Sequence, residues 1–214
     1  MNKKDILKHI FIFLSIISLI TVIIIGSLSA LLFNKEYYNL LYAKTGTYER
    51  LDKELVSNKT DELFLFLKNK SSLDTDFYTE NEISHLKDVK NIMKITFIVY
   101  YLSLFLLLVS ICHFYIKFRK EFVLLLSRIL NYSGITIFII AIIFFMFNFS
   151  GLFEIFHKLL FKGNYTFPYT SNMIKMFSED FFKLFAEEIF KISIIKTVVS
   201  LSIGSFLIWK TNKK

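Results

Sequence analysis

Two histidines stand out among the residues of this 214-residue chain that could carry out acid–base chemistry. His85 and His157 each have a glutamate three positions earlier, Glu82 and Glu154, and this spacing places both side chains on one face of a helix. An imidazole with its ordinary pKa near 6.5 exchanges protons readily at neutral pH, so two of them can serve as a base and an acid. The sequence therefore predicts a proton-transfer site built on His85 and His157.

The carboxylates near these histidines leave two interpretations open. A glutamate one turn before a histidine commonly orients the ring or selects its tautomer, and Asp88, three residues after His85, is a third candidate for this role. Two Glu-x-x-His pairs also occur in di-iron sites of four-helix bundles, where Glu187 or Glu188 would add a ligand. Both pairs here lie at predicted helix ends rather than in a bundle core. We therefore expect no metal, and keep a membrane metalloenzyme as an alternative.

The helix that carries His85 has a clear predicted start. Thr79 and Glu82 form a T-x-x-E capping box, in which each side chain bonds to the backbone amide of the other residue. The helix can continue without proline or glycine into an apolar stretch that begins at residue 95, about 15 Å along the axis from His85. His157 follows another apolar stretch by about 6 Å, so both imidazoles are predicted at headgroup depth.

Long uncharged stretches indicate an α-helical integral membrane protein. The chain is 54% hydrophobic, and four stretches, about 10–33, 95–116, 129–153 and 189–209, exceed the length of about 20 residues that a bilayer core requires. We predict a single membrane domain over residues 1–214, with four transmembrane helices and a small extracytoplasmic cap from residues 34–94 and 154–188. Lys196 interrupts the fourth stretch and is expected to face protein or water.

The distribution of charge predicts the topology. The N-terminus, the connection between the second and third spans and the C-terminus together hold ten basic and two acidic residues, which is the whole net charge of +8. The remaining segments hold 16 of each sign. Because basic residues accumulate on the cytoplasmic side, both termini are predicted to be cytoplasmic and the cap to be outside. The basic balance is thus explained without nucleic acid. The lone cysteine, Cys112, excludes a disulfide within the chain.

Aromatic residues are expected to mark the outer surface. An interfacial belt of Tyr37, Tyr38, Leu41 and Tyr42 is predicted to extend the first span outward, and residues 51–56 and 63–67 are predicted to form short amphipathic helices. The second outer loop is rich in phenylalanine. So much exposed aromatic surface implies burial against the cap, lipid headgroups or a ligand.

At this point the sequence resembles a known family. Residues 79–90, TENEISHLKDVK, resemble the E-x-x-H-x-x-D-V-K segment of the bacterial lipoprotein intramolecular transacylases, and residues 156–161, FHKLLF, resemble that family's second histidine motif. Met173-Ile174 and residues 177–182, FSEDFF, resemble its L-I-x-x-F-P-E-x-F-F segment, with Ser178 in the place of the proline. A tryptophan of the family is absent, although Tyr165 and Phe167 lie near its expected position.

The resemblance implies an acyltransferase in the bacterial plasma membrane with its active site at the outer face. Its partners would be membrane lipid and diacylglyceryl-modified lipoproteins. The sn-2 fatty acyl chain would move to the α-amine of the lipoprotein's own N-terminal cysteine, giving a lyso-form lipoprotein. No cofactor is implied, because an ester becomes a more stable amide.

By analogy with the family, His85 would deprotonate the amine and His157 would protonate the leaving glyceryl oxygen. Glu82, Asp88 and Glu154 would orient them. Catalysis would depend mainly on folding the headgroup into a tight ring inside an aromatic pocket. The residues expected to line it are Tyr78, Phe156, Phe161, Phe181 and Phe182. A non-enzymatic membrane assembly factor with an aromatic outer patch is a further alternative; it predicts that both histidines are replaceable.

Overall fold

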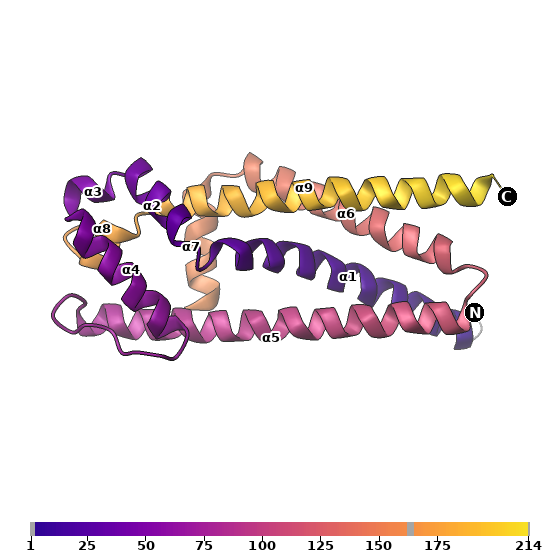
Figure 1. Ribbon diagram of the computed structural model, residues 1–214, viewed down its shortest axis with the longest axis horizontal. Coiled ribbons are helices and arrows are strands. Elements are labelled where there is room, and N and C mark those ends of the chain that lie inside the picture. Colours follow the sequence, from indigo (N-terminus) through magenta and orange to yellow (C-terminus); the bar gives the residue numbers. More distant parts are fainter. Residues whose placement is uncertain (1–2, 162–164, 214) are drawn as a thin grey trace. The chain divides into compact units, whose positions relative to one another are not determined.

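The computed structural model describes residues 3–161 and 165–213, and every regular element within them is a helix (Figure 1). In chain order these are α1 (Lys3–Leu31), α2 (Lys35–Lys44), α3 (Thr47–Arg50), α4 (Lys53–Leu67), α5 (Glu80–Lys117), α6 (Phe122–Met146), α7 (Phe149–Leu160), α8 (Asn172–Met176) and α9 (Glu179–Asn212). Helices α1, α5, α6 and α9 are each long and apolar enough to cross a membrane. The predicted all-helical fold with four transmembrane helices is thus confirmed.

The third uncharged stretch is divided between two helices rather than forming one. Helix α6 ends at Met146, and α7 begins at Phe149. Asn148 separates them: its side-chain oxygen accepts a hydrogen bond from the amide of Ser150 (3.2 Å), which caps the start of α7. An uncharged stretch cannot reveal this break by hydropathy alone, and the consequence is that His157 lies on a separate, shorter helix.

The chain divides into two compact units. The span unit comprises residues 1–28, 96–146 and 189–214, and the cap unit comprises residues 29–95 and 147–188. The histidines of the predicted site, His85 and His157, both belong to the cap unit. The cap unit is therefore the part of the molecule that positions the site.

The span unit is held together by close helix–helix packing. Phe114, Leu125 and Ile129 form its buried core cluster. At Gly134 of α6 the two helices approach so closely that an added Cβ atom would lie 2.6 Å from the Leu201 side chain on α9. The Nζ of Lys196 donates a hydrogen bond to Ser27 Oγ on α1 (3.1 Å), so this lysine faces protein, as expected.

An aromatic core organises the cap unit. Tyr42 is fully buried between α2 and the first turn of α9, where its ring stacks on Phe181 with centroids 5.5 Å apart. Its hydroxyl hydrogen-bonds to Thr60 on α4 (2.9 Å). Tyr38 is also buried and packs edge-on against Phe64. The prediction of an interfacial belt at Tyr38 and Tyr42 was therefore wrong, because their rings form the core of the cap.

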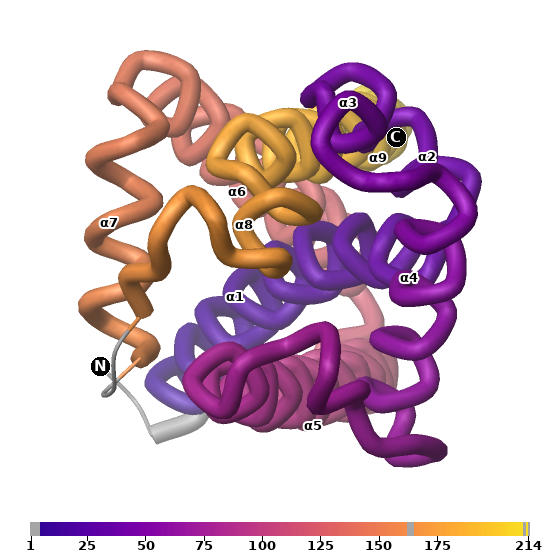
Figure 2. The backbone as a smooth tube through the Cα atoms, turned by 90° about the vertical axis from the view of Figure 1, so that its left-hand side faces the viewer, coloured from indigo at the N-terminus to yellow at the C-terminus, as the bar shows by residue number. Residues whose placement is uncertain are grey.

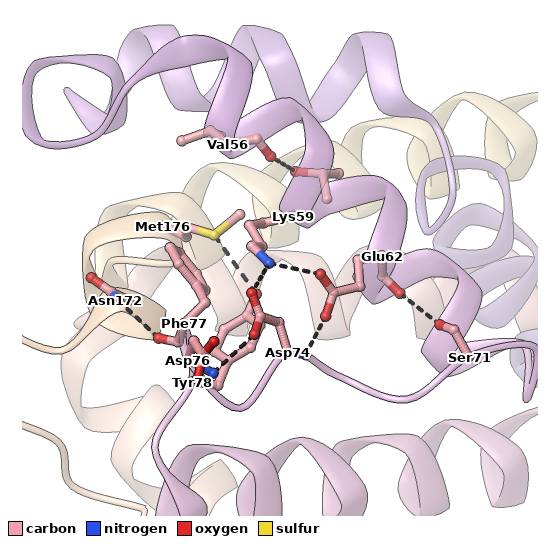
Figure 3. Close-up of polar contacts among 11 residues, drawn as sticks. Val56, Lys59, Glu62, Ser71, Asp74, Asp76, Phe77, Tyr78, Asn172 and Met176 are labelled. Atoms are coloured by element: carbon pink, nitrogen blue, oxygen red, sulfur yellow. Dashed lines mark hydrogen bonds and ion pairs between the residues drawn. The ribbon is translucent and has the colours of Figure 1, made fainter.

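A polar network fastens the connection between α4 and α5 (Figure 3). The Nζ of Lys59 on α4 forms ion pairs with Glu62 (2.9 Å) and with Asp74 in the connection. Glu62 also accepts a hydrogen bond from the Asp74 amide. Helix α4 is one continuous helix with Asp52 as its N-cap, where the sequence had suggested two short ones. The network places Phe77 and Tyr78 directly before the start of α5 (Figure 3).

Candidate active site

Helix α5 begins as predicted, with a reciprocal capping box. The Thr79 amide donates to Glu82 Oε2 (2.7 Å), and the Glu82 amide donates to Thr79 Oγ1 (3.3 Å). These bonds satisfy backbone donors that the first turn of any helix leaves without partners. They fix the start of α5 at Glu80, so that His85 lies in the second turn of this helix.

Glu82 also joins α5 to a segment almost ninety residues later. Its Oε1 accepts a hydrogen bond from the hydroxyl of Ser171, the N-cap residue of α8, and another from the Met173 amide (2.9 Å). Its Oε2 accepts from the amide and the hydroxyl of Thr79. The side chain is therefore a buried carboxylate, 1% exposed, with both oxygens engaged. Burial opposes its ionisation, but these donors outweigh burial and hold the pKa of Glu82 below its usual range.

The two predicted histidines meet in the structure. The rings of His85 on α5 and His157 on α7 stack nearly parallel, with centroids 6.1 Å apart and planes 12° from parallel. Phe161 packs against both rings, at 4.5 Å from His85 and 5.2 Å from His157. Both imidazoles are half-buried. Two residues far apart in sequence thus form a single site inside an aromatic enclosure.

Residues 165–171, which lead into α8, run between α7 and α8 (Figure 2), and two of their side chains contact the histidine pair. Phe167 lies 5.4 Å from the His85 ring, and Tyr165 lies 5.4 Å from the His157 ring. These two residues stand near the position where the related family has a tryptophan. Aromatic cover of this kind reduces access of water to both imidazoles, which strengthens electrostatic interactions at the site.

A backbone hydrogen bond selects the tautomer of His157. Its Nδ1 lies 2.7 Å from the carbonyl oxygen of Phe153, one turn earlier on α7. A carbonyl oxygen has no proton, so Nδ1 must be the donor in this bond. In the neutral ring the lone pair therefore resides on Nε2, which is the nitrogen available for exchanging a proton with a substrate.

The surroundings of His85 favour its neutral form. Burial lowers the pKa of His85 first, the neighbouring His157 lowers it further, and the carboxylate of Asp88 raises it. The pKa of His85 lies below the usual value near 6.5, so the ring is unprotonated at neutral pH. A second proton on the pair is disfavoured, because two imidazolium ions at this separation repel each other.

A cavity of about 390 Å³ adjoins the pair within the cap unit. One wall is the start of α5 with Thr79, Asn81 and Glu82, and the other is formed by residues 166–168 and 170–172. Phe167 belongs both to this wall and to the enclosure of His85. Phe77 is also part of the lining, and its carbonyl accepts a hydrogen bond from Asn172 Nδ2 (2.8 Å; Figure 3).

The other predicted site residues are distributed unevenly around the pair. Phe156 and Phe161 contact the histidine rings, with Phe156 at 5.5 Å from His157. Phe182 packs against Phe153, which in turn contacts His157. Tyr78 and Phe181 are almost fully buried in the core of the cap. Their part in substrate binding, like that of the three phenylalanines, stays a prediction.

The carboxylates of the two Glu-x-x-His pairs point to different partners. Glu154 lies on the exposed side of α7 and forms an ion pair with Lys158 (2.5 Å), which lowers its pKa. Glu82 bonds to Thr79, Ser171 and Met173 as described. Within residues 3–161 and 165–213, the structure shows no group of three or more His, Cys, Asp and Glu that could hold a metal ion. The ligand set of the metalloenzyme alternative is thus not assembled here.

Several neighbours of the pair were not singled out from the sequence as site residues. Phe153, Tyr165 and Phe167 enclose the rings, and Ser171 and Asn172 line the cavity. One usable signal existed for Ser171, because a serine shortly after a Pro-containing turn is a typical helix N-cap. Its bond to Glu82, 89 positions away, has no local signature.

The fold and the site together define a class: multi-pass helical membrane proteins with a second compact helical unit that holds a pair of stacked histidines. The family model described as "Lipoprotein intramolecular transacylase Lit" matches residues 12–182, and the chain belongs to this family of membrane acyltransferases. No functionally curated protein matches the chain by sequence. The family suggested by the two histidine motifs is therefore confirmed.

Solved structures of similar fold carry the same family name. The in meso structure of the lipoprotein intramolecular transacylase Lit from Bacillus cereus has a TM-score of 0.78 at 21% identity, and the match covers 98% of this chain and 100% of that one. A variant of that protein, in which one histidine is replaced by alanine, has a TM-score of 0.79 at 20% identity over 99% and 98% of the two chains. These likenesses confirm the fold over nearly the whole chain.

Proposed function

We propose that this protein transfers the sn-2 fatty acyl chain of an S-diacylglyceryl lipoprotein to the α-amine of the same N-terminal cysteine. The observation that carries the proposal is the stacked pair of His85 and His157, contributed by two helices and enclosed by aromatic rings. Family membership supports a lipoprotein substrate and acyl transfer. The oxygen that gives up the acyl chain and the nitrogen that accepts it are our inference.

Starting from the ammonium form of the substrate, the reaction removes two protons from nitrogen and adds one to oxygen. An α-amine has a pKa near 8 and is mostly an ammonium ion at neutral pH, so it must lose a first proton, which passes to water, before it is nucleophilic. The neutral amine then attacks the ester carbonyl, an N–C bond forms, and the bond between the acyl carbon and the glyceryl oxygen breaks. The second proton passes from the nitrogen to a base, an acid gives one proton to the glyceryl oxygen, and the net release is one proton to the solvent.

The two histidines suit these roles. His85, whose pKa is lowered, is neutral and can accept the proton from the amine. His157 would deliver a proton to the leaving oxygen through Nε2, since Nδ1 is engaged by Phe153. After each turnover the proton returns from His85 to His157 directly or through water. Amine and ester belong to one molecule, so the enclosure contributes chiefly by holding them together.

The proposed location is the outer face of the bacterial plasma membrane. Helix α7 supports this, because it begins three residues after the end of the apolar helix α6 and is itself amphipathic. Ile155 and Leu159, which are 55% and 78% exposed, lie on the side of α7 opposite His157. A helix with such a face is suited to the headgroup boundary of a bilayer, with the histidine directed toward the cap.

The test is the structure of the product in living cells. Wild-type protein is expressed in a bacterium that makes diacylglyceryl lipoproteins, and tandem mass spectrometry of an N-terminal lipopeptide shows which atom carries each acyl chain. We expect an isobaric product with one acyl chain on nitrogen, which is lost in His85→Ala and His157→Ala. His9→Ala, an exposed histidine on α1, is the matched control and should retain activity. A product that persists without either site histidine would contradict the proposal and favour an assembly factor.

A further inference from the structure

The cavity of about 390 Å³ beside the histidine pair lies within the size range of ligand-binding pockets and has a distinctive lining. Most of its side chains are hydroxyls and amides, which both donate and accept hydrogen bonds. They are Thr79, Asn81, Thr166, Thr170, Ser171 and Asn172. The hydroxyls of Thr79 and Ser171 already donate to Glu82, and Asn172 Nδ2 donates to the Phe77 carbonyl, so these groups offer a ligand mainly their acceptor lone pairs. No lysine, arginine or histidine is among its lining residues in the described part of the chain.

This chemistry selects against most parts of a lipid. A phosphate headgroup would find no cationic side chain among the lining residues that the structure describes, and a fatty acyl chain would meet hydroxyl or amide side chains at six of the ten lining positions. The single acidic residue, Glu82, has both oxygens occupied by neighbouring donors, so it offers no free site for a cation. An uncharged ligand rich in both donors and acceptors fits best, and a peptide backbone is such a ligand.

The position of the cavity connects it to the chemistry. Phe167 separates the cavity from the ring of His85, 5.4 Å away, and Glu82 lies one helical turn before His85. In the proposed reaction the acylated cysteine must lie at the histidines, and the rest of the lipoprotein must leave the site through polar surroundings. We propose, as an extension that rests on the proposed function, that this cavity binds the peptide segment directly after the lipidated cysteine, with preference for small uncharged residues.

The experiment compares two synthetic substrates with the purified full-length protein in lipid nanodiscs. One is S-diacylglyceryl cysteine amide alone, and the other carries four further residues, Ser-Gly-Ser-Asn. Thr170→Trp fills the cavity from an exposed wall position, and Thr170→Val removes one hydroxyl with little change in volume. Thr75→Trp, at an exposed loop position of the same unit outside the cavity lining, is the matched control.

For the wild type we expect a higher kcat/KM with the longer substrate. Thr170→Trp should reduce the ratio of kcat/KM between the long and short substrates about tenfold, the size of one or two lost hydrogen bonds, and Thr170→Val should reduce it severalfold. Thr75→Trp should keep the wild-type ratio.

The peptide subsite would be overturned if neither Thr170 variant changes the ratio of kcat/KM between the long and short substrates, whether both substrates are affected equally or not at all. Wild-type protein that converts neither substrate would instead overturn the proposed function. Thermal unfolding of each variant verifies folding, and Thr170→Val keeps the test open if Thr170→Trp does not fold.

Discussion

At the scale of single residues, the charge on His85 decides whether it can act as a base. Burial and His157 lower its pKa, and Asp88 opposes them by raising it. The proposed base is lost when the pH falls through this pKa, because the protonated ring cannot accept a proton. The acid limb of kcat/KM, which reports ionisations of the free enzyme and of the free substrate amine, should therefore include a step with a midpoint below pH 6.5.

Asp88→Asn tests this assignment by removing the one carboxylate that raises the pKa of His85. We expect the midpoint of the acid limb to move to lower pH, and only slightly, since Asp88 is exposed and solvent screens its charge. The measurement is kcat/KM against pH with a lipopeptide substrate. Glu80→Gln removes the same charge from the first turn of α5 and should leave the midpoint unchanged. A shift to higher pH in Asp88→Asn would contradict the role of His85 as base.

Glu82 links α5 to the start of α8 by hydrogen bonds, so its replacement should reduce the free energy of unfolding. Glu82→Gln removes the charge that four donors surround, and places an amide NH₂ against some of those donors. We expect a loss of about 2–3 kcal/mol in the free energy of unfolding, typical of hydrogen bonds to a buried charged group. Glu80→Gln, at an exposed position two residues earlier, should change the free energy of unfolding little.

The contribution of ionised Glu82 to stability can also be measured from the pH dependence of the free energy of unfolding. Since the pKa of Glu82 is depressed in the folded state, its contribution is present above the unfolded-state pKa near 4.5 and is lost as the pH falls through the folded-state value. Wild type should therefore lose stability in that acid range more steeply than Glu82→Gln. Parallel curves for the two proteins would show that the pKa of Glu82 is the same in the folded and unfolded states, which would contradict the prediction.

The residues that could be predicted were those with local signals. The capping box at Thr79 and Glu82 depends on a spacing of three, and the structure shows both of its bonds. The pairing of His85 with His157 followed from their similar predicted depth beside two spans. The second function of Glu82 could not be predicted in this way, because its bond to Ser171 joins segments 89 residues apart.

At the scale of elements, the connection between α4 and α5 is held mainly by polar contacts. Lys59 forms ion pairs with Glu62 and Asp74 and lies 5.2 Å from the centroid of the Phe77 ring (Figure 3). Phe77 is part of the cavity lining, so this network supports one wall of the proposed peptide subsite.

Lys59→Ala should loosen this connection. Two neighbouring carboxylates would then lack their common cation and repel each other. We expect severalfold faster proteolytic cleavage within residues 68–79, measured by mass spectrometry of the fragments, and a lower kcat/KM with the longer lipopeptide. Lys70→Ala removes an exposed lysine of the same connection and is the control. Equal cleavage rates in the two variants would show that the ion pairs do not hold the connection.

Helices could be predicted from the sequence where hydropathy or charge changes along the chain. Their ends could not be predicted where a single side chain determines where a helix stops or starts. The four long apolar helices follow from composition and length. The end of α6 does not, because residues on both sides of the break are apolar and Asn148 alone provides the cap of α7. The prediction that the aromatic residues after α1 form an interfacial belt was wrong for a related reason. A tyrosine is amphipathic, and nothing local distinguishes an interfacial ring from Tyr42, which is buried with its hydroxyl bonded to Thr60.

At the scale of the whole molecule, the span unit depends on close packing at glycine. Gly134→Ala would bring a Cβ within 2.6 Å of the Leu201 side chain, so helices α6 and α9 must shift. We expect a loss of about 1–3 kcal/mol in the free energy of unfolding, the usual effect of overpacking. Gly26→Ala is the matched control on α1: its nearest neighbour would be 3.6 Å away, an ordinary contact. That variant should be neutral or slightly stabilised, because alanine favours helix more than glycine. Titration with a denaturing detergent in mixed micelles measures both.

The orientation of the chain in the membrane follows from its charge and can be tested independently of activity. All of the net charge of +8 lies at the two termini and in the segment that connects α5 to α6, which predicts that these segments are cytoplasmic and that the cap is outside.

Cys112 is first replaced by serine, so that an introduced cysteine is the only thiol. Ser72→Cys, at an exposed position of the cap unit, should then react with a membrane-impermeant maleimide in intact cells. Lys210→Cys, near the end of α9, should react only after the membrane is permeabilised. The reverse labelling pattern would place the histidine pair on the cytoplasmic side. Mature lipoproteins present their acylated cysteine at the outer leaflet, so that result would contradict the proposed substrate as well as the topology.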